Sequence, residues 1–393
     1  MRVVYFSHDD GKYGAPKSLM DLLEVLIRRD DFTPIVVTSK SNEFNEWCNN
    51  KGIENYSIPY SDCMYGYEKK RAILRKIHSV YIHGIIRMKH DLFNQFFITK
   101  IEGLIDFKNV DIIHSNVSII DIGAIISKHY SIPHVWHIRE YGMSSEYAYI
   151  PFRRNFCKYI EKNSSVALCI SEYVKDNWVK MGLNPECIKV EYDAVKSPEL
   201  IEYELKKHDK VRIIFSGSST PAKGLIDLLK AIEILHKKNI NNYVLYVYGD
   251  YSNDYGQKLI EWVKNHKIDN VVQFQEFDEQ LKNKISRFDI GVVTSRSEAF
   301  GRVTVEYMMA GLCLIASNTG ANPELIIDNY SGLVYQYNNP NSLARLLEKV
   351  IVNKTLRKSL KLSARKYAEE KFDTKKCADR ILQIYYSLME RKI

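Results

Sequence analysis

Short, continuous apolar runs alternate with longer amphipathic stretches along most of the chain. In the first half these runs predict strands at 2–7, 34–38, 55–58, 111–114, 133–137, 165–170 and 188–190. In the second half they predict strands at 211–216, 243–249, 271–274, 289–294, 312–316 and 333–335. Strands covered by helices on both faces are apolar throughout, so the pattern predicts an α/β architecture of doubly wound parallel sheets.

A polar and charged segment, 193–210, separates the two series of strands and contains Pro198. It predicts an N-terminal domain over 1–192, a linker over 193–210 and a C-terminal domain over 211–371, followed by a helical segment, 372–393. The 393 residues, of which 45% are hydrophobic, are sufficient for two separate cores.

The segment 295–311 sets two carboxylates, Glu298 and Glu306, around a Phe300-Gly301 pair. The apolar run before it predicts a buried strand, so the segment lies at a strand's carboxyl end, where open α/β sheets bind ligands. We expect Glu298 on the loop and Glu306 inside the following helix, whose first N–H groups suit a phosphate. Carboxylates for hydroxyls beside amides for phosphate predict a nucleotide-sugar site.

A second candidate element follows the strand predicted at 211–216. Gly217 begins a turn, and Lys223 precedes Gly224 at the entry of an apolar helical stretch. A lysine held at a helix entry can neutralise a diphosphate, and glycines let the backbone approach it closely.

The two acidic residues and the Phe300-Gly301-Arg302 between them resemble the E-x7-E signature of retaining GT-B glycosyltransferases of family 4, in the glycogen-synthase-like clan. The resemblance implies the GT-B fold, with two Rossmann-like domains facing a central cleft and segment 372–393 crossing back to the first domain. It implies transfer of a hexosyl group from a nucleoside-diphosphate sugar to a glycan or a polyprenyl- or lipid-linked glycan. In this branch the usual role is bacterial surface polysaccharide biosynthesis, as for capsule or O-antigen.

The same resemblance assigns the site residues. It gives catalytic roles to Glu298 and His137, which would contact the transferred sugar, and to Lys223, which would meet the diphosphate. The donor-binding residues would be Gly14, Ala15, Gly217, Ser218, Phe300, Gly301, Arg302 and Glu306. His137 could instead be a structural histidine, and the turn at Gly14 an ordinary strand-to-helix connection.

The chain departs from the family pattern at two positions. Ala15 stands where the family has a second glycine, and Ser218 stands where it has an arginine. Arg302 and Arg139 are the candidates to supply the missing cation. No Asp-x-Asp is present to hold a divalent metal, so we expect a metal-independent enzyme with no cofactor beyond its donor.

Charge is concentrated in one segment of a chain whose formal net charge is +8. Residues 67–100 contain eight Lys or Arg and two acidic residues, a net charge of +6, interleaved with apolar residues. Such a stretch can lie on an anionic membrane; the alternative is the solvated face of an ordinary helix. No nucleic-acid-binding motif accompanies the charge, so we expect no nucleic-acid partner.

The sequence has no apolar run long enough to span a bilayer, and its start lacks the pattern of a signal peptide. We therefore expect a cytoplasmic protein, or a peripheral one on the inner face of the cytoplasmic membrane. Two other functions remain open. A sugar-nucleotide epimerase of the same fold would need no acceptor, and a catalytically silent protein would bind a nucleotide-sugar without turnover.

Overall fold

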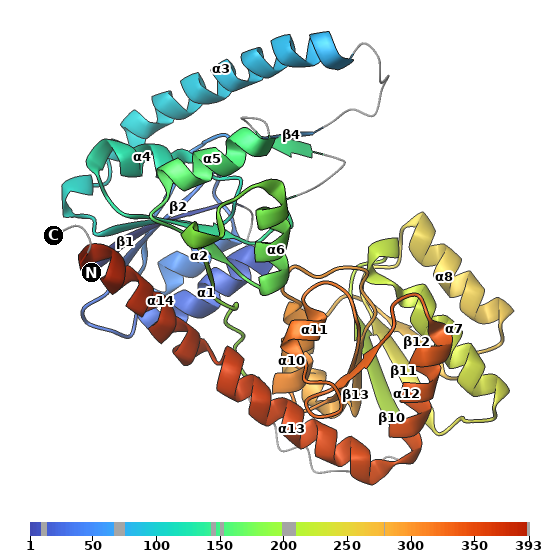
Figure 1. Cartoon of the computed structure of the whole chain (residues 1–393). Helices are drawn as coiled ribbons and strands as arrows, with labels where there is room; N and C mark the ends of the chain where they lie inside the picture. The colour runs from blue at the N-terminus through green and yellow to red at the C-terminus, as the bar shows by residue number, and fades with distance from the viewer. Residues whose placement is uncertain are drawn as a thin grey trace. The chain divides into compact units, whose positions relative to one another are not determined.

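The computed structural model describes residues 1–8, 14–66, 75–142, 147–149, 153–198, 210–278 and 280–390, with the main chain alone at 65–66, 75–84, 147–149 and 153–155. The chain divides into two compact units (Figure 1). The N-terminal unit contains Met1–Ala194 and Thr374–Ile393, and the C-terminal unit contains Val195–Asp373. The sequence-based boundaries were 192 and 371. Much of the predicted linker, 199–209, lies outside the described residues.

A parallel sheet in the order β3-β2-β1-β5-β6-β8-β9 forms the centre of the N-terminal unit. Its strands are β1 (Arg2–Ser7), β2 (Thr33–Thr38), β3 (Glu54–Ser57), β5 (Ile112–Ser115), β6 (His134–Ile138), β8 (Val166–Cys169) and β9 (Ile188–Val190). Its helices are α1 (Gly14–Leu26), α2 (Glu43–Asn50), α3 (Arg75–Glu102), α4 (Ile122–Tyr130), α5 (Arg153–Asn163), α6 (Glu172–Met181) and α14 (Thr374–Glu390).

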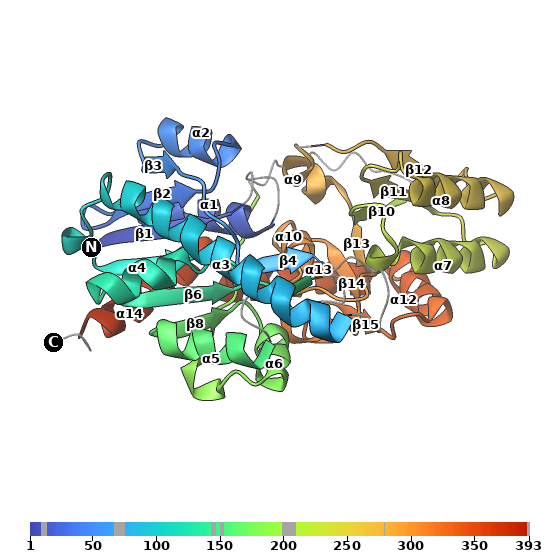
Figure 2. The same cartoon turned by 90° about the horizontal axis from the view of Figure 1, so that it is seen from above.

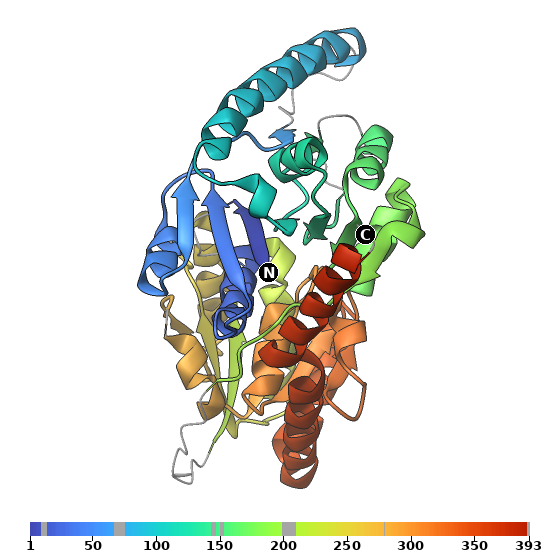
Figure 3. The ribbon, with the colours of Figure 1, turned by 90° about the vertical axis from the view of Figure 1, so that its left-hand side faces the viewer.

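The last helix, α14, belongs to the first sheet, although the whole C-terminal unit separates it from that sheet in the sequence. It lies against α1 on one face of the sheet, while α4 and α5 cover the opposite face (Figures 1 and 3). Ile381 and Tyr385 of α14 share one apolar cluster with Leu19 and Leu23 of α1 and Tyr5 of β1. Burial of these apolar side chains therefore holds α14 against the N-terminal sheet.

The C-terminal unit contains a second parallel sheet, in the order β12-β11-β10-β13-β14-β15. Its strands are β10 (Val211–Ser216), β11 (Tyr243–Tyr248), β12 (Val272–Gln275), β13 (Ile290–Val293), β14 (Cys313–Ser317) and β15 (Leu333–Tyr335). Its helices are α7 (Leu225–Lys237), α8 (Asp254–Asn265), α9 (Leu281–Lys284), α10 (Arg302–Met309), α11 (Asn322–Leu325), α12 (Pro340–Val352) and α13 (Lys354–Phe372). In Figures 1 and 2, α7, α8 and α12 lie on one face of the sheet, and α10 and α13 lie on the other.

The predicted α/β class with two parallel sheets is confirmed. Every strand expected from the apolar runs is present, with each end within one residue of its predicted position. A short antiparallel pair, β4 (Met64–Gly66) and β7 (Tyr147–Tyr149), was not predicted. Each of these strands has only three residues, and their pairing joins segments far apart in the sequence.

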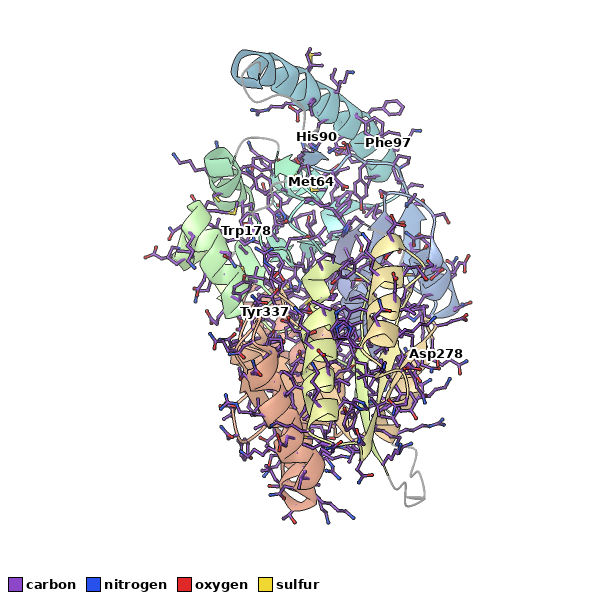
Figure 4. All side chains as sticks on the ribbon, turned by 90° about the vertical axis from the view of Figure 1, so that its right-hand side faces the viewer. Met64, His90, Phe97, Trp178, Asp278 and Tyr337 are labelled. Atoms are coloured by element: carbon purple, nitrogen blue, oxygen red, sulfur yellow. The ribbon has the colours of Figure 1, made fainter. Side chains whose placement is uncertain are left out.

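Helix α3 lies beyond α4 on the same side of the N-terminal sheet (Figure 1). Figure 4 labels His90 and Phe97 on this helix. The imidazole of His90 is buried, with Nε2 3.2 Å from Asp121 Oδ1 and Nδ1 3.2 Å from Asp91 Oδ1. Asp62 also interacts electrostatically with His90. The ion pair with Asp121 therefore attaches α3 to the start of α4.

This ion pair makes the stability of the N-terminal unit depend on pH. Burial lowers the pKa of His90, but the hydrogen bonds and charges of Asp121 and Asp91 raise it to about 9. Because an unfolded histidine has a pKa of about 6.5, the stabilisation is fully present below pH 6.5 and is lost as the pH rises through 9.

We expect the free energy of unfolding to fall between pH 6.5 and 9, and His90→Gln to remove most of that dependence. Urea unfolding at several pH values, with His129→Gln on exposed α4 surface as the control, measures the effect. Equal slopes for the His90→Gln variant and the unmodified protein would contradict the assignment.

Candidate functional site

The loop between β13 and α10 carries the two predicted acidic residues. Glu298 lies on this loop and Glu306 lies in the second turn of α10. Gly301 precedes α10 and has a φ of +90°, a backbone conformation that residues other than glycine rarely adopt. The first N–H groups of α10 therefore lie between the two carboxylates in the chain.

The loop after β10 brings Lys223 to Glu298. Gly224 has a φ of +66°, and a Cβ added there would lie 2.1 Å from the carbonyl oxygen of Thr294. Thr294 Oγ1 donates to the carbonyl oxygen of Lys223 at 2.8 Å, and the N–H of Arg296 donates to that of Ala222 at 2.7 Å. Only glycine fits at position 224, so the loops of two neighbouring parallel strands are joined at one edge of the sheet.

These contacts set the Nζ of Lys223 2.7 Å from Oε1 of Glu298. Both side chains remain partly exposed, at 33% and 20%. The pair therefore combines a cation, suited to phosphate, with a carboxylate, suited to hydroxyl groups, and both are accessible to a ligand.

The segment that follows a third strand, β14, holds the main chain of Glu298 in place. The N–H of Ala321, just after β14, donates to the carbonyl oxygen of Glu298 at 2.9 Å. Gly320 has a φ of +62°, and a Cβ there would lie 2.2 Å from the nitrogen of Glu298. The sequence prediction missed Gly320, although a glycine just after an expected strand is a signal that could have indicated it.

Close packing also holds the start of α10 in place. Asn322, fully buried, accepts a hydrogen bond from Thr304 Oγ1 at 2.7 Å, and a Cβ at Gly301 would lie 3.2 Å from the same oxygen, Oδ1. Phe300 is 3% exposed, and its ring packs edge-on against Phe372, with 5.9 Å between the centroids. The side chain of Phe300 therefore belongs to the core of the C-terminal unit.

Gly217 and Ser218 follow β10 directly. The N–H of Gly217 donates to the carbonyl oxygen of Tyr248 at 3.1 Å, and a Cβ at Gly249 would lie 2.2 Å from the carbonyl oxygen of Gly217. The side chain of Ser218, which replaces the expected arginine, is exposed. This loop therefore packs closely against the end of β11 without placing a cation at position 218.

The two arginines considered as replacements lie in different units. Arg302 is at the start of α10, in the same unit as Lys223, and its Nε lies 3.1 Å from Glu306 Oε1. Arg139 is buried in the N-terminal unit, where its Nη1 pairs with Asp193 and its Nε donates to the carbonyl oxygen of Asn116 at 2.9 Å. The charge of Arg139 is thus already balanced by a buried partner.

The N-terminal unit contains the remaining predicted residues. Gly14 and Ala15 begin α1, and Asn116 Nδ2 donates to the carbonyl oxygen of Ala15 at 3.2 Å. A Cβ at Gly14 would meet nothing within 4 Å, so packing does not require glycine at this position. The rest of the predicted glycine loop, 9–13, lies outside the described residues.

His137 lies in β6 and is buried, with its Nδ1 3.1 Å from Nε2 of His114. Burial, with the charge of Arg139 and the neighbouring His114, lowers the pKa of His137 well below its usual range. The imidazole is therefore neutral, and its low basicity argues against a role as general base.

Comparisons with known proteins show what this chain resembles in sequence and in fold. Residues 196–367 match the family described as Glycosyl transferases group 1. This region of the chain is therefore similar to group 1 glycosyltransferases. The chain is 29% identical over 329 residues to an uncharacterized glycosyltransferase of Methanocaldococcus jannaschii, covering 79% of this chain and 86% of the relative. It is 26% identical over 238 residues to an uncharacterized 41.2 kDa protein in the cps region of Klebsiella pneumoniae, covering 58% and 63%.

Solved structures identify the fold of this chain. HepE of Anabaena in complex with UDP superimposes with a TM-score of 0.78 at 18% identity, covering 98% of this chain and 100% of HepE. The complex of HepE with UDP-glucose gives a TM-score of 0.73 at 17% identity, with the same coverage. The predicted GT-B fold is therefore confirmed.

Proposed function

We propose that this protein is a glycosyltransferase that moves a hexosyl group, with retention of configuration, from UDP-sugar to a hydroxyl of a glycan or lipid-linked glycan. The observation that carries the proposal is the contact between Lys223 and Glu298 at the strand edge, beside the start of α10. The complexes of HepE with UDP and UDP-glucose support a uridine nucleotide.

The proposed chemistry is electrostatic and positional. The bond between the anomeric carbon and a phosphate oxygen breaks, and the anomeric carbon bonds to the acceptor oxygen. The acceptor proton passes to the departing phosphate. Lys223 and the first N–H groups of α10 stabilise the charge that develops on the diphosphate. Glu298 holds hydroxyls of the transferred sugar and Glu306 those of the ribose, and this scheme uses no protein nucleophile or metal.

A thermal-shift panel of UDP-, GDP-, ADP- and dTDP-sugars tests the donor. A ligand at 100 times its dissociation constant stabilises by about 2.7 kcal/mol, and we expect the largest shift with a UDP-sugar. Radiolabelled sugar must then appear on a second molecule. Label that stays on the nucleotide with an altered sugar would show an epimerase, and binding without turnover would show a silent binding protein.

We further propose that the acceptor is presented at an anionic membrane and that α3 contacts this membrane. Met88, Leu92 and Phe96 recur every four residues on one side of α3 and are 56%, 66% and 60% exposed. Arg87, Lys89 and Lys100 accompany them on the same helix. An exposed apolar stripe with basic neighbours suits an interfacial helix, and within the described ranges no helix is long and apolar enough to cross a bilayer.

This location agrees with a role in surface polysaccharide synthesis on the cytoplasmic side of the membrane, which the Klebsiella relative in a cps region supports. Much of the predicted basic segment, including Lys69, Lys70 and Arg71, lies outside the described residues. The exposed apolar stripe of α3 is therefore the part of this surface that can be tested directly.

The double variant Leu92→Ser and Phe96→Ser is expected to reduce binding to phosphatidylglycerol vesicles by at least about tenfold, because inserting each side chain is worth about 1.5–3 kcal/mol. Transfer to a soluble acceptor should be unchanged. Leu362→Ser, at an equally exposed leucine of α13, is the matched control. Failure of the unmodified protein to bind these vesicles at ~0.15 M salt would make α3 an ordinary solvated helix.

A further inference from the structure

A chain of four buried side chains leads from the core of the N-terminal unit to His137. The hydroxyl of Tyr5 on β1 lies 3.0 Å from that of Tyr385 on α14. The hydroxyl of Tyr385 lies 2.6 Å from Nδ1 of His114 on β5, and Nε2 of His114 lies 3.1 Å from Nδ1 of His137. Within the described part of the chain, Nε2 of His137 is buried without a hydrogen-bond partner.

All four groups are neutral. Burial raises the pKa of Tyr5 and of Tyr385, so both hydroxyls keep their protons. Burial also lowers the pKa of His114, as it does that of His137. Each neutral imidazole has one N–H donor and one acceptor nitrogen, so the four protons must all point the same way along the chain.

Two observations determine this direction. Nη2 of Arg139 lies 3.4 Å from Nδ1 of His137, and a guanidinium only donates, so Nδ1 must be the acceptor. At the other end, the hydroxyl of Tyr5 has Tyr385 as its hydrogen-bond partner among the described residues. If the protons pointed the opposite way, the buried Tyr5 proton would have no acceptor and an N–H of His137 would face Arg139.

Tyr5 therefore donates its hydrogen bond to Tyr385, Tyr385 donates to His114, and His114 donates to His137. This order leaves the proton of His137 on Nε2. Nearby, a cavity lined by His137, Arg139, Glu191, Asp193 and Ser18 is large enough for about one water molecule. A neutral N–H at a buried position is a hydrogen-bond donor, and an oxygen atom would be a suitable acceptor for it.

We propose that Tyr385 and His114 are positioning residues that hold His137 in its Nε2–H form, ready to donate to an oxygen of the transferred sugar. The proposal rests on the proposed transfer function. It assigns a task to α14, because this helix brings to the reaction a tyrosine that lies 271 residues from His114 in the sequence. The interaction acts on the transferred sugar, so it should affect turnover more than nucleotide affinity.

The first test observes the proton without any substrate. Nitrogen NMR of the full chain labelled with ¹⁵N-histidine distinguishes the two neutral forms of imidazole and the charged form, and His137→Gln identifies the signals among the 11 histidines. We expect His137 to be in the Nε2–H form at pH 7 and Tyr385→Phe to produce a mixture of forms. An Nδ1–H or charged His137 in the unmodified protein would overturn the proposal.

The second test is kinetic. Tyr385→Phe should lower kcat by about fivefold or more, the loss of one hydrogen bond, with little change in the UDP dissociation constant. His114→Gln retains an N–H donor and should keep more activity than His114→Leu. The control, Tyr386→Phe, removes a hydroxyl from the next residue of the same helix, where it contacts exposed Asp31, and should leave kcat unchanged.

The outcomes separate this inference from the proposed function. If transfer occurs while Tyr385→Phe matches the unmodified enzyme in kcat, the positioning role is wrong and the transferase function stands. If His137 shows the Nε2–H form but no sugar is transferred to any acceptor, the proton order is correct, while the transferase function and the task assigned to His137 both fail.

Discussion

Replacing Glu298 with Gln is expected to lower turnover by at least about tenfold while UDP still binds as well as before, or more tightly. Gln keeps the shape of the side chain but removes the charge that strengthens its hydrogen bonds to sugar hydroxyls. A hydrogen bond to a charged group contributes about 1.5–3 kcal/mol. The carboxylate lies 2.7 Å from Lys223, so its neutralisation also releases that cation for the diphosphate.

Glu306→Gln is the matched comparison, since it makes the same chemical change eight residues along the chain. Its proposed ligand is the ribose, so it should weaken UDP by about tenfold or more. It also removes the charge that pairs with Arg302 at 3.1 Å, so Arg302→Gln is measured beside it to isolate that effect. Calorimetry with UDP on the three variants decides between the roles. Equal losses of affinity for the two glutamate variants, or losses in the reverse order, would mean that the carboxylates are assigned wrongly.

Lys223→Ala is expected to weaken both UDP binding and turnover, each by about tenfold or more. The charge that this side chain neutralises is present on the bound diphosphate and grows as the sugar departs, so both quantities depend on it. The substitution also leaves Glu298 without its partner, and an unpaired carboxylate beside a phosphate repels it. Lys230→Ala, at an exposed position on α7, is the control.

A double-mutant cycle separates these two effects. If Glu298 repels the diphosphate once Lys223 is removed, the combination of Lys223→Ala with Glu298→Gln should bind UDP more tightly than Lys223→Ala alone. Turnover should remain low in both. If the UDP affinity of Lys223→Ala is unchanged, Lys223 is not part of the donor site, whatever the result of the double-mutant cycle.

Much of the fold could be predicted because its signal is local. A strand buried between helices must be apolar along its whole length, so each run such as 211–216 indicates a strand without knowledge of its neighbours. The positions of Glu298 on a loop and Glu306 on a helix followed from the same reasoning. The β4–β7 pair was missed because each strand has only three residues and their pairing joins segments far apart in the sequence, which no local pattern reports.

The residue types and their order along the chain were thus determined by the sequence itself: two carboxylates around Phe300-Gly301, and a lysine before Gly224. The tertiary structure decided which of these groups meet. Lys223 contacts Glu298 because β10 and β13 are neighbours in the sheet and Gly224 lets their loops touch, and Gly320 holds Glu298 from a third strand.

The surroundings of His137 depended still more on the fold. The sequence indicated a histidine at the end of a strand, with a structural role as the alternative. Its partner His114 comes from β5 and in turn contacts Tyr385 of α14. Asp193, which the sequence placed in a linker, pairs with the neighbouring Arg139. Hydrogen-bond direction and pKa depend on burial and on neighbours distant in sequence, so only the packed structure decided the protonation of His137.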